Sequence, residues 1–114
     1  TPAWRTRRED FDLMVGELVT ELIRRWPQVA TIEFAVEDVP PSNPAPWESH
    51  NVVVARIFPA DRRRGLRDRI VVYRLPITLR CAPEEVALMT RRVLIERISH
   101  ILALPPDEID DAMR

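Results

Sequence analysis

Two side chains near the C-terminal end, Glu96 and His100, have the spacing of a metal-binding or acid–base pair. Residues four apart lie on one face of a helix, so a carboxylate and an imidazole at these positions can reach one divalent cation such as zinc. A third ligand would have to come from Asp107, Asp110 or His50. The simpler interpretation, which we favour, is an ordinary pair of side chains on a helix surface, worth a few tenths of a kcal/mol.

The residue that follows Glu96 is Arg97, and it limits the chemistry of this segment. An arginine side chain stays protonated at any useful pH, so it cannot accept a proton as a general base. Its positive charge also opposes a divalent cation if the guanidinium faces the same site. The segment therefore lacks the proton acceptor that a hydrolytic metal site needs.

The rest of the sequence offers no second catalytic arrangement. The serines at positions 42, 49 and 99 lie outside any nucleophile-elbow pattern. Cys81 is the only cysteine, so an internal disulfide is excluded, and we expect a small hydrophobic residue that is at least half-buried. With 2 glycines in the chain, a phosphate-cradling loop is also excluded.

Length and charge narrow the classes of partner. A chain of 114 residues, 46% of them hydrophobic, fits a single domain over residues 1–114 with one core. The 17 basic and 18 acidic residues nearly balance, so neither nucleic acid nor an anionic membrane is an expected partner. No apolar run approaches the roughly 18 residues that span a bilayer, which makes a cytoplasmic location the default expectation.

All the basic residues are arginine, a bias typical of GC-rich bacterial genomes.

Two long helices are predicted from apolar periodicity. Thr6 and Glu9 form a capping-box pattern, and the apolar residues behind them recur every three or four positions until Pro27, which predicts a helix over residues 7–25. Pro83 followed by two glutamates starts a second helix, which runs to about residue 103 before two prolines. Glu96, Arg97 and His100 therefore belong to the second helix.

Three strands are predicted between these helices. Ile32, Phe34 and Val36 alternate with less apolar residues, and the segments 51–58 and 68–74 are rich in β-branched residues. Residues 39–50 hold four prolines and form a long loop, whereas residues 59–67 form a basic turn that we expect to be solvated. The expected fold is α+β, with two main helices packed on a small three-stranded sheet.

Several segments together resemble a known family. The sequence DRIVVYRLPI at residues 68–77, the helix ending RRVLIERISH at residues 91–100, and the strand and acidic-proline turn at residues 34–41 resemble the minimal zincin-like metalloproteases, which are small bacterial proteins. In that family a strand of this type precedes a helix bearing the motif H-E-x-x-H, whose histidines bind zinc and whose glutamate activates the zinc-bound water. The resemblance implies a zincin-like fold for the chain.

The site residues of the family are mostly replaced here. Glu96 occupies the place of the first histidine, Arg97 the place of the general base, and His100 the place of the second histidine. Ala103 stands where the family has a glycine, and Pro106 where it has its third ligand, an aspartate; Asp107 is one residue later. By resemblance, this is a zincin-like protein with a degenerate motif.

We therefore expect no catalytic residue and no cofactor, and a domain that binds a peptide or protein partner. A peptide would pair with the strand over residues 68–74, along Ile70, Val72 and Tyr73, in the cleft beside the second helix. The alternative is an active zinc-dependent metallopeptidase with the ligands Glu96, His100 and Asp107. Substrate, partner and oligomeric state do not follow from the sequence.

Overall fold

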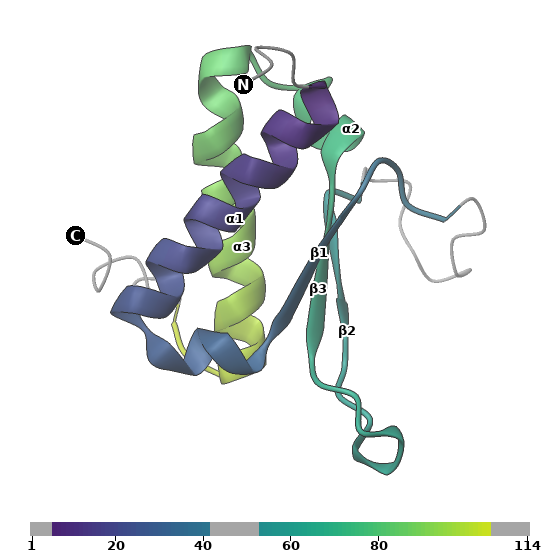
Figure 1. Ribbon diagram of the computed structural model, residues 1–114, viewed down its shortest axis with the longest axis vertical. Helices are drawn as coiled ribbons and strands as arrows, with labels where there is room; N and C mark the ends of the chain where they lie inside the picture. Colours follow the sequence, from purple (N-terminus) through teal and green to yellow (C-terminus); the bar gives the residue numbers. More distant parts are fainter. Residues whose placement is uncertain (1–5, 42–52, 106–114) are drawn as a thin grey trace.

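The computed structural model describes residues 6–41 and 53–105. Within these ranges the chain forms three α-helices and one three-stranded mixed sheet, so the predicted α+β class is confirmed (Figure 1). The elements in chain order are α1 (Arg7–Arg25), β1 (Glu33–Glu37), β2 (Ala55–Phe58), β3 (Arg69–Tyr73), α2 (Arg74–Thr78) and α3 (Val86–Leu102). A short 3₁₀ turn precedes β1, a second lies between β2 and β3, and a third leads into α3.

Helix α1 has the bounds that its capping pattern predicts. The backbone N–H of Glu9 donates to Oγ1 of Thr6 at 3.0 Å, which satisfies one of the free amides of the first turn. The Glu9 carboxylate accepts from the Thr6 hydroxyl at 3.2 Å, rather than from the Thr6 amide that a capping box would use. At the other end the Trp26 N–H donates to the Leu22 carbonyl, and Pro27 cannot continue the helix.

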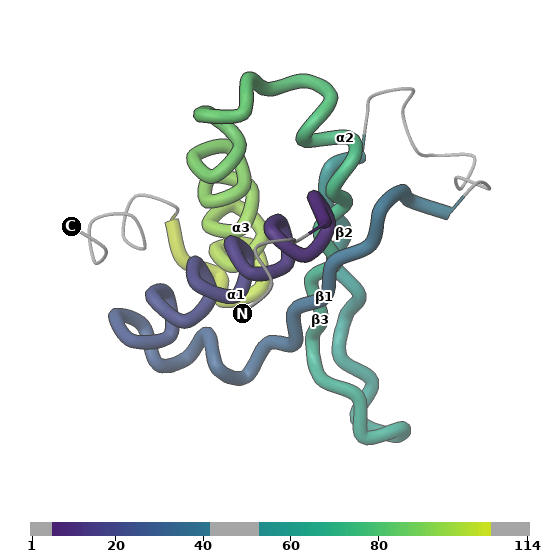
Figure 2. The backbone as a smooth tube through the Cα atoms, turned by 45° about the horizontal axis from the view of Figure 1, so that its top comes forward, coloured from purple at the N-terminus to yellow at the C-terminus, as the bar shows by residue number. Residues whose placement is uncertain are grey.

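The sheet has β3 at its centre. β1 pairs with β3 in parallel, from Glu33 beside Arg69 to Glu37 beside Tyr73, and β2 pairs with the other side of β3 in antiparallel orientation. The prediction of a peptide-binding edge along Ile70, Val72 and Tyr73 is therefore wrong, because both sides of this strand are already hydrogen-bonded within the sheet. Among the described residues, the unpaired edges of the sheet belong to β1 and β2 (Figure 2).

One hydrophobic core joins the helices to the sheet. Helices α1 and α3 cover the same face of the sheet (Figure 1). Ile70 and Val72 of β3 belong to the core between the sheet and these two helices. The core also contains buried side chains from both helices, among them Phe11, Val15, Leu22, Leu94, Ile95 and Ile98. Because a large part of α3 is held by this core, the helix is a rigid support for the residues at positions 96–100.

Two local features differ from the sequence prediction or refine it. The strand that was predicted over residues 68–74 runs from Arg69 to Tyr73 in the structure. A short helix, α2, follows it with Pro76 in its first turn, where a proline ring is tolerated. The basic segment 59–67 is the turn of the β2–β3 hairpin, with the exposed arginines 62–64 in a 3₁₀ turn that Asp61 caps and Gly65 ends at φ 68°. Cys81 is half-buried, as expected.

Candidate functional site

The C-terminal end of α3 has an unusual backbone conformation. Ala103 lies in the left-handed region, at φ 54° and ψ 39°, and its N–H donates to the Ser99 carbonyl. The N–H of Leu104 donates to the same carbonyl at 3.0 Å, so the chain turns sharply away from the helix axis. Glycine is the usual residue in this conformation, and Ala103 stands where the resemblance places a glycine. The helix therefore ends in a left-handed turn that an alanine, rather than a glycine, adopts.

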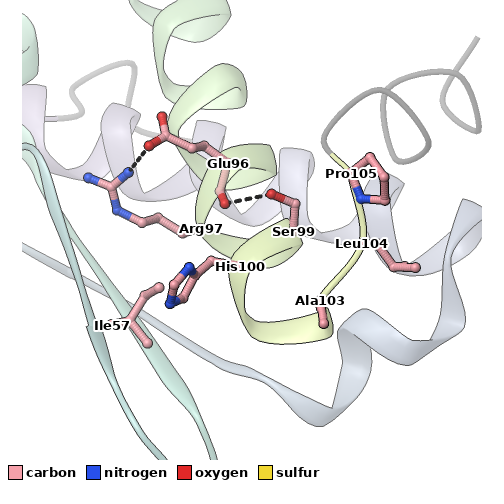
Figure 3. A pocket seen from close by; sticks show the side chains of 8 residues that line it. All are labelled: Ile57, Glu96, Arg97, Ser99, His100, Ala103, Leu104 and Pro105. Carbon is pink, nitrogen blue, oxygen red and sulfur yellow. Dashed lines mark hydrogen bonds and ion pairs between the residues drawn. The ribbon is translucent and has the colours of Figure 1, made fainter.

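An open pocket lies against this end of the helix. It has a volume of about 660 Å³. Figure 3 shows the side chains that line it: Ile57, Glu96, Arg97, Ser99, His100, Ala103, Leu104 and Pro105. Glu96, Arg97 and His100, the residues that the resemblance singled out, thus share one pocket, and Ile57 of the edge strand β2 forms the wall opposite His100.

Glu96 and Arg97, which are neighbours on α3, bind each other beside this pocket. Nη1 of Arg97 donates to Oε1 of Glu96 at 2.9 Å. The Arg97 side chain is 23% exposed and the Glu96 side chain 70% exposed, so the guanidinium is the more enclosed partner. In Figure 3 the Glu96 carboxylate turns toward this guanidinium, whereas the His100 ring points toward Ile57. The carboxylate and the imidazole do not converge on a common point in this arrangement.

The neighbouring side chains supply little reactivity. Ser99 is buried, and its hydroxyl donates to the Glu96 carbonyl at 2.8 Å, a local bond of the helix that leaves no base beside it. His100 is exposed at the pocket mouth. Leu104 and Pro105, which sequence reasoning missed as pocket residues, add apolar surface. The pocket therefore combines the partly buried guanidinium of Arg97 and the imidazole of His100 with an apolar wall.

The described residues hold no group of three or more histidine, cysteine, aspartate or glutamate side chains that could bind a metal ion. The third ligands that the sequence offered, Asp107, Asp110 and His50, all lie outside the described residues. The ligand set Glu96, His100 and Asp107 therefore stays a prediction. Its first member, however, has its carboxylate engaged with a guanidinium.

The DRIVVYRLPI segment stabilises the fold, and none of its residues lines the pocket. Oδ1 of Asp68 accepts the Ala60 N–H at 3.0 Å, and the Asp68 carbonyl accepts the Glu33 N–H at 2.9 Å. Arg74, in the same segment, donates from Nε to Oδ1 of Asp38 at 2.9 Å. These polar residues close the hairpin and tie β1 to β3, while the apolar residues between them fill the core.

The comparisons with known proteins leave the family open. No protein-family model matches the chain, and no curated protein gives a significant match to it. Within residues 6–41 and 53–105, no helix combines the length and apolarity that crossing a bilayer requires.

Proposed function

We propose that this chain is a zincin-like domain without metallopeptidase chemistry, which uses the pocket beside α3 to bind an extended segment of a peptide or protein. The observation that carries the proposal is the bond between Arg97 and Glu96. In the arrangement that the resemblance implies, these two positions would hold the general base and a zinc ligand. Here they neutralise each other's charge instead.

Two effects lead us to expect that catalysis is lost. Removing a general base alone lowers the rate of a hydrolytic reaction by a factor of about 10² to 10⁴. A carboxylate that is bound to a guanidinium must also break that charge-assisted hydrogen bond before it can bind a metal ion. Both effects act against a zinc site made from Glu96 and His100, so the metallopeptidase alternative has the weaker support.

Peptide binding is supported by the edge strand beside the pocket. The Tyr73 N–H donates to the Val54 carbonyl, and antiparallel pairing alternates, so the backbone N–H and C=O of Ile57 point away from β3. A peptide can therefore extend the sheet at β2, which replaces β3 as the strand proposed for pairing. Its side chains would then meet the apolar wall of Ile57 and Leu104.

The remaining hydrogen-bond donors of Arg97 indicate the kind of segment that fits the pocket. Arg97 has several N–H donors, of which the bond to Glu96 uses one at Nη1. The remaining donors can hold a peptide carbonyl or a carboxylate, while the wall takes an aliphatic side chain. We therefore expect an extended segment with an acidic residue next to an aliphatic one.

The test uses a library of peptides that covers both acidic and basic sequences. Binding of an acidic, aliphatic peptide should shift the ¹⁵N amide signals of Ile57, Arg97 and His100, and Ile57→Asp should weaken it because a carboxylate then faces the ligand. Mass spectrometry of the same library should find no cleavage. Metal-dependent cleavage that a chelator stops would refute the proposal, as would the absence of any peptide that shifts these amides.

A further inference from the structure

Within residues 6–41 and 53–105, the outer edge of β1 leaves backbone groups without hydrogen-bond partners. The Glu33 N–H donates to the Asp68 carbonyl, so in the parallel ladder the odd-numbered residues of β1 face β3. The N–H and C=O groups of Phe34 and Val36 consequently point away from the sheet. No described residue hydrogen-bonds to these groups. The edge is therefore a template on which another strand can pair.

A groove runs between this edge and α1. Its volume is about 270 Å³, and its lining combines Phe34, Ala35 and Val36 of β1 with Asp12, Val15, Gly16 and Val19 of α1. At Gly16 an added Cβ would meet nothing within 4 Å, so the helix leaves open space beside the strand. Side chains on the helix side of an added strand can enter this space, whose walls are mainly apolar.

Carboxylates lie close to both ends of the β1 edge. Asp12 lines the groove on its helix side, and Glu33 and Glu37 stand at the two ends of β1, with their side chains on the face of the sheet opposite the groove. None of these carboxylates has an ion-pair partner among the described residues. A partner strand that brings positive charge to both ends of β1 would pair with them.

The same charges argue against self-pairing. If two copies of β1 paired in antiparallel fashion about Ala35, the outward N–H and C=O groups of Phe34 and Val36 would all form hydrogen bonds. Glu33 would, however, lie directly opposite Glu37 of the other copy. Like charges in directly opposed positions destabilise a strand pair. Two such contacts would form in the dimer, so a second copy is a poor occupant.

We propose that the β1 edge binds an extended segment of a partner protein with the pattern basic, aliphatic, any residue, aliphatic, basic. The basic residues lie opposite Glu33 and Glu37, and the aliphatic ones lie opposite Phe34 and Val36, where they face the groove. The pattern reads the same in both directions, so it fits parallel and antiparallel pairing alike. Natural edge strands are commonly protected by proline, lysine or a bulge, and β1 has none of these over Glu33–Glu37.

This surface is distinct from the pocket beside α3. β1 and β2 lie on opposite sides of β3, so the two edges cannot share one peptide strand. The preferred charges also differ, because the pocket offers the guanidinium of Arg97 and the β1 edge offers the carboxylates of Glu33 and Glu37. Binding at one edge can therefore be measured without interference from the other.

The test titrates the full chain into a fluorescein-labelled peptide of sequence Arg-Val-Thr-Val-Arg and follows fluorescence polarisation. We expect saturable binding that weakens as salt is added. The double substitution Glu33→Arg with Glu37→Arg should weaken it by about tenfold or more, and should create binding of the peptide Glu-Val-Thr-Val-Glu. Methylating the peptide amides that face β1 should abolish binding, since the main-chain hydrogen bonds are then lost.

Gly16→Leu provides a variant that fills the groove while favouring the helix, so weaker peptide binding with unchanged circular dichroism supports the site. The inference is overturned if both peptides bind equally, or if amide methylation has no effect. Shifted ¹⁵N amide signals at Ile57 and His100 instead of Phe34 and Val36 would assign the peptide to the α3 pocket and reject the β1 site alone. Dimers that form without peptide through the Phe34 and Val36 amides would replace the partner segment by a second copy.

Discussion

The Nε–H of Arg74 donates to Oδ1 of Asp38 at 2.9 Å, and this bond joins the residue that follows β3 to the residue that follows β1. The Leu75 N–H donates to the carbonyl of the same aspartate at 3.0 Å, and Arg8 approaches its other oxygen at 3.5 Å. Asp38 thus connects α1, β1 and the start of α2. Two of the segments that carry the family resemblance, residues 34–41 and 68–77, are in direct contact here.

Removing this bond should destabilise the fold. Arg74→Ala leaves the half-buried Asp38 carboxylate with only the longer contact to Arg8, and the side chain of Arg74 is itself 15% exposed. A hydrogen bond to a charged group typically contributes about 1.5–3 kcal/mol, so the free energy of unfolding in urea should fall by about 1–2 kcal/mol.

Arg64→Ala is the matched control for that measurement. Arg64 approaches Asp61 at 3.6 Å in the hairpin turn, and its side chain is 79% exposed. Ion pairs this exposed contribute about 0–1 kcal/mol, so the change should stay below about 0.5 kcal/mol. Equal losses for the two variants would show that Asp38 is no anchor of the fold.

The left-handed residue at the end of α3 predicts a stabilising substitution. An alanine at φ 54° carries a steric cost from its Cβ that glycine lacks, and this cost exceeds the extra chain entropy that glycine loses on folding. Ala103→Gly should therefore raise the free energy of unfolding by about 0.5–1 kcal/mol. Ala87→Gly, in the right-handed part of α3, should lower it by a similar amount. A loss at both positions would contradict the backbone geometry of the helix end.

Introducing the H-E-x-x-H motif of the zincin-like family should create metal affinity. The double substitution Glu96→His with Arg97→Glu gives the sequence H-E-I-S-H on a helix that the core already holds in place. Two histidines four residues apart then face the pocket, and the repelling guanidinium is gone. Calorimetric titration should show zinc binding at least about tenfold tighter than in the parent chain.

A control variant shows whether the gain in zinc affinity depends on the pocket or on the spacing of the two histidines alone. Glu17→His with Glu21→His places two histidines at the same spacing on α1, beside a different surface. The pocket variant should bind zinc more tightly than this control, because the apolar residues Leu104 and Pro105 line the same pocket and limit the access of water to its histidine pair. Equal affinities would mean that the end of α3 has no zincin-like arrangement.

The sequence predicted the elements better than their arrangement. Periodicity and caps located α1 from Arg7 to Arg25 because local hydrogen bonds and one apolar face define a helix. Apolar alternation located β3, yet it could not show which neighbours flank the strand, since pairing joins residues far apart in the chain. The helix α2 was missed because the segment LPI has no capping signal and continues the apolar pattern of β3.

The candidate site was predicted in part as well. Glu96, Arg97 and His100 were expected on one helix, and they do line one pocket. The bond between Glu96 and Arg97 was not specifically predicted, because adjacent residues on a helix usually point in different directions. Ile57 could not be found either, since only the hairpin pairing brings β2 over α3. A signal for Asp38 did exist, namely an acidic residue directly after a strand and before two prolines.

The amount of zinc bound by the unmodified chain tests the central proposal most directly. The protein is equilibrated with excess zinc, dialysed, and measured by elemental mass spectrometry beside His100→Ala. Because Arg97 holds the Glu96 carboxylate and opposes a cation, we predict far less than one zinc per chain and no difference between the two proteins. About one zinc per chain that disappears in His100→Ala would contradict the account.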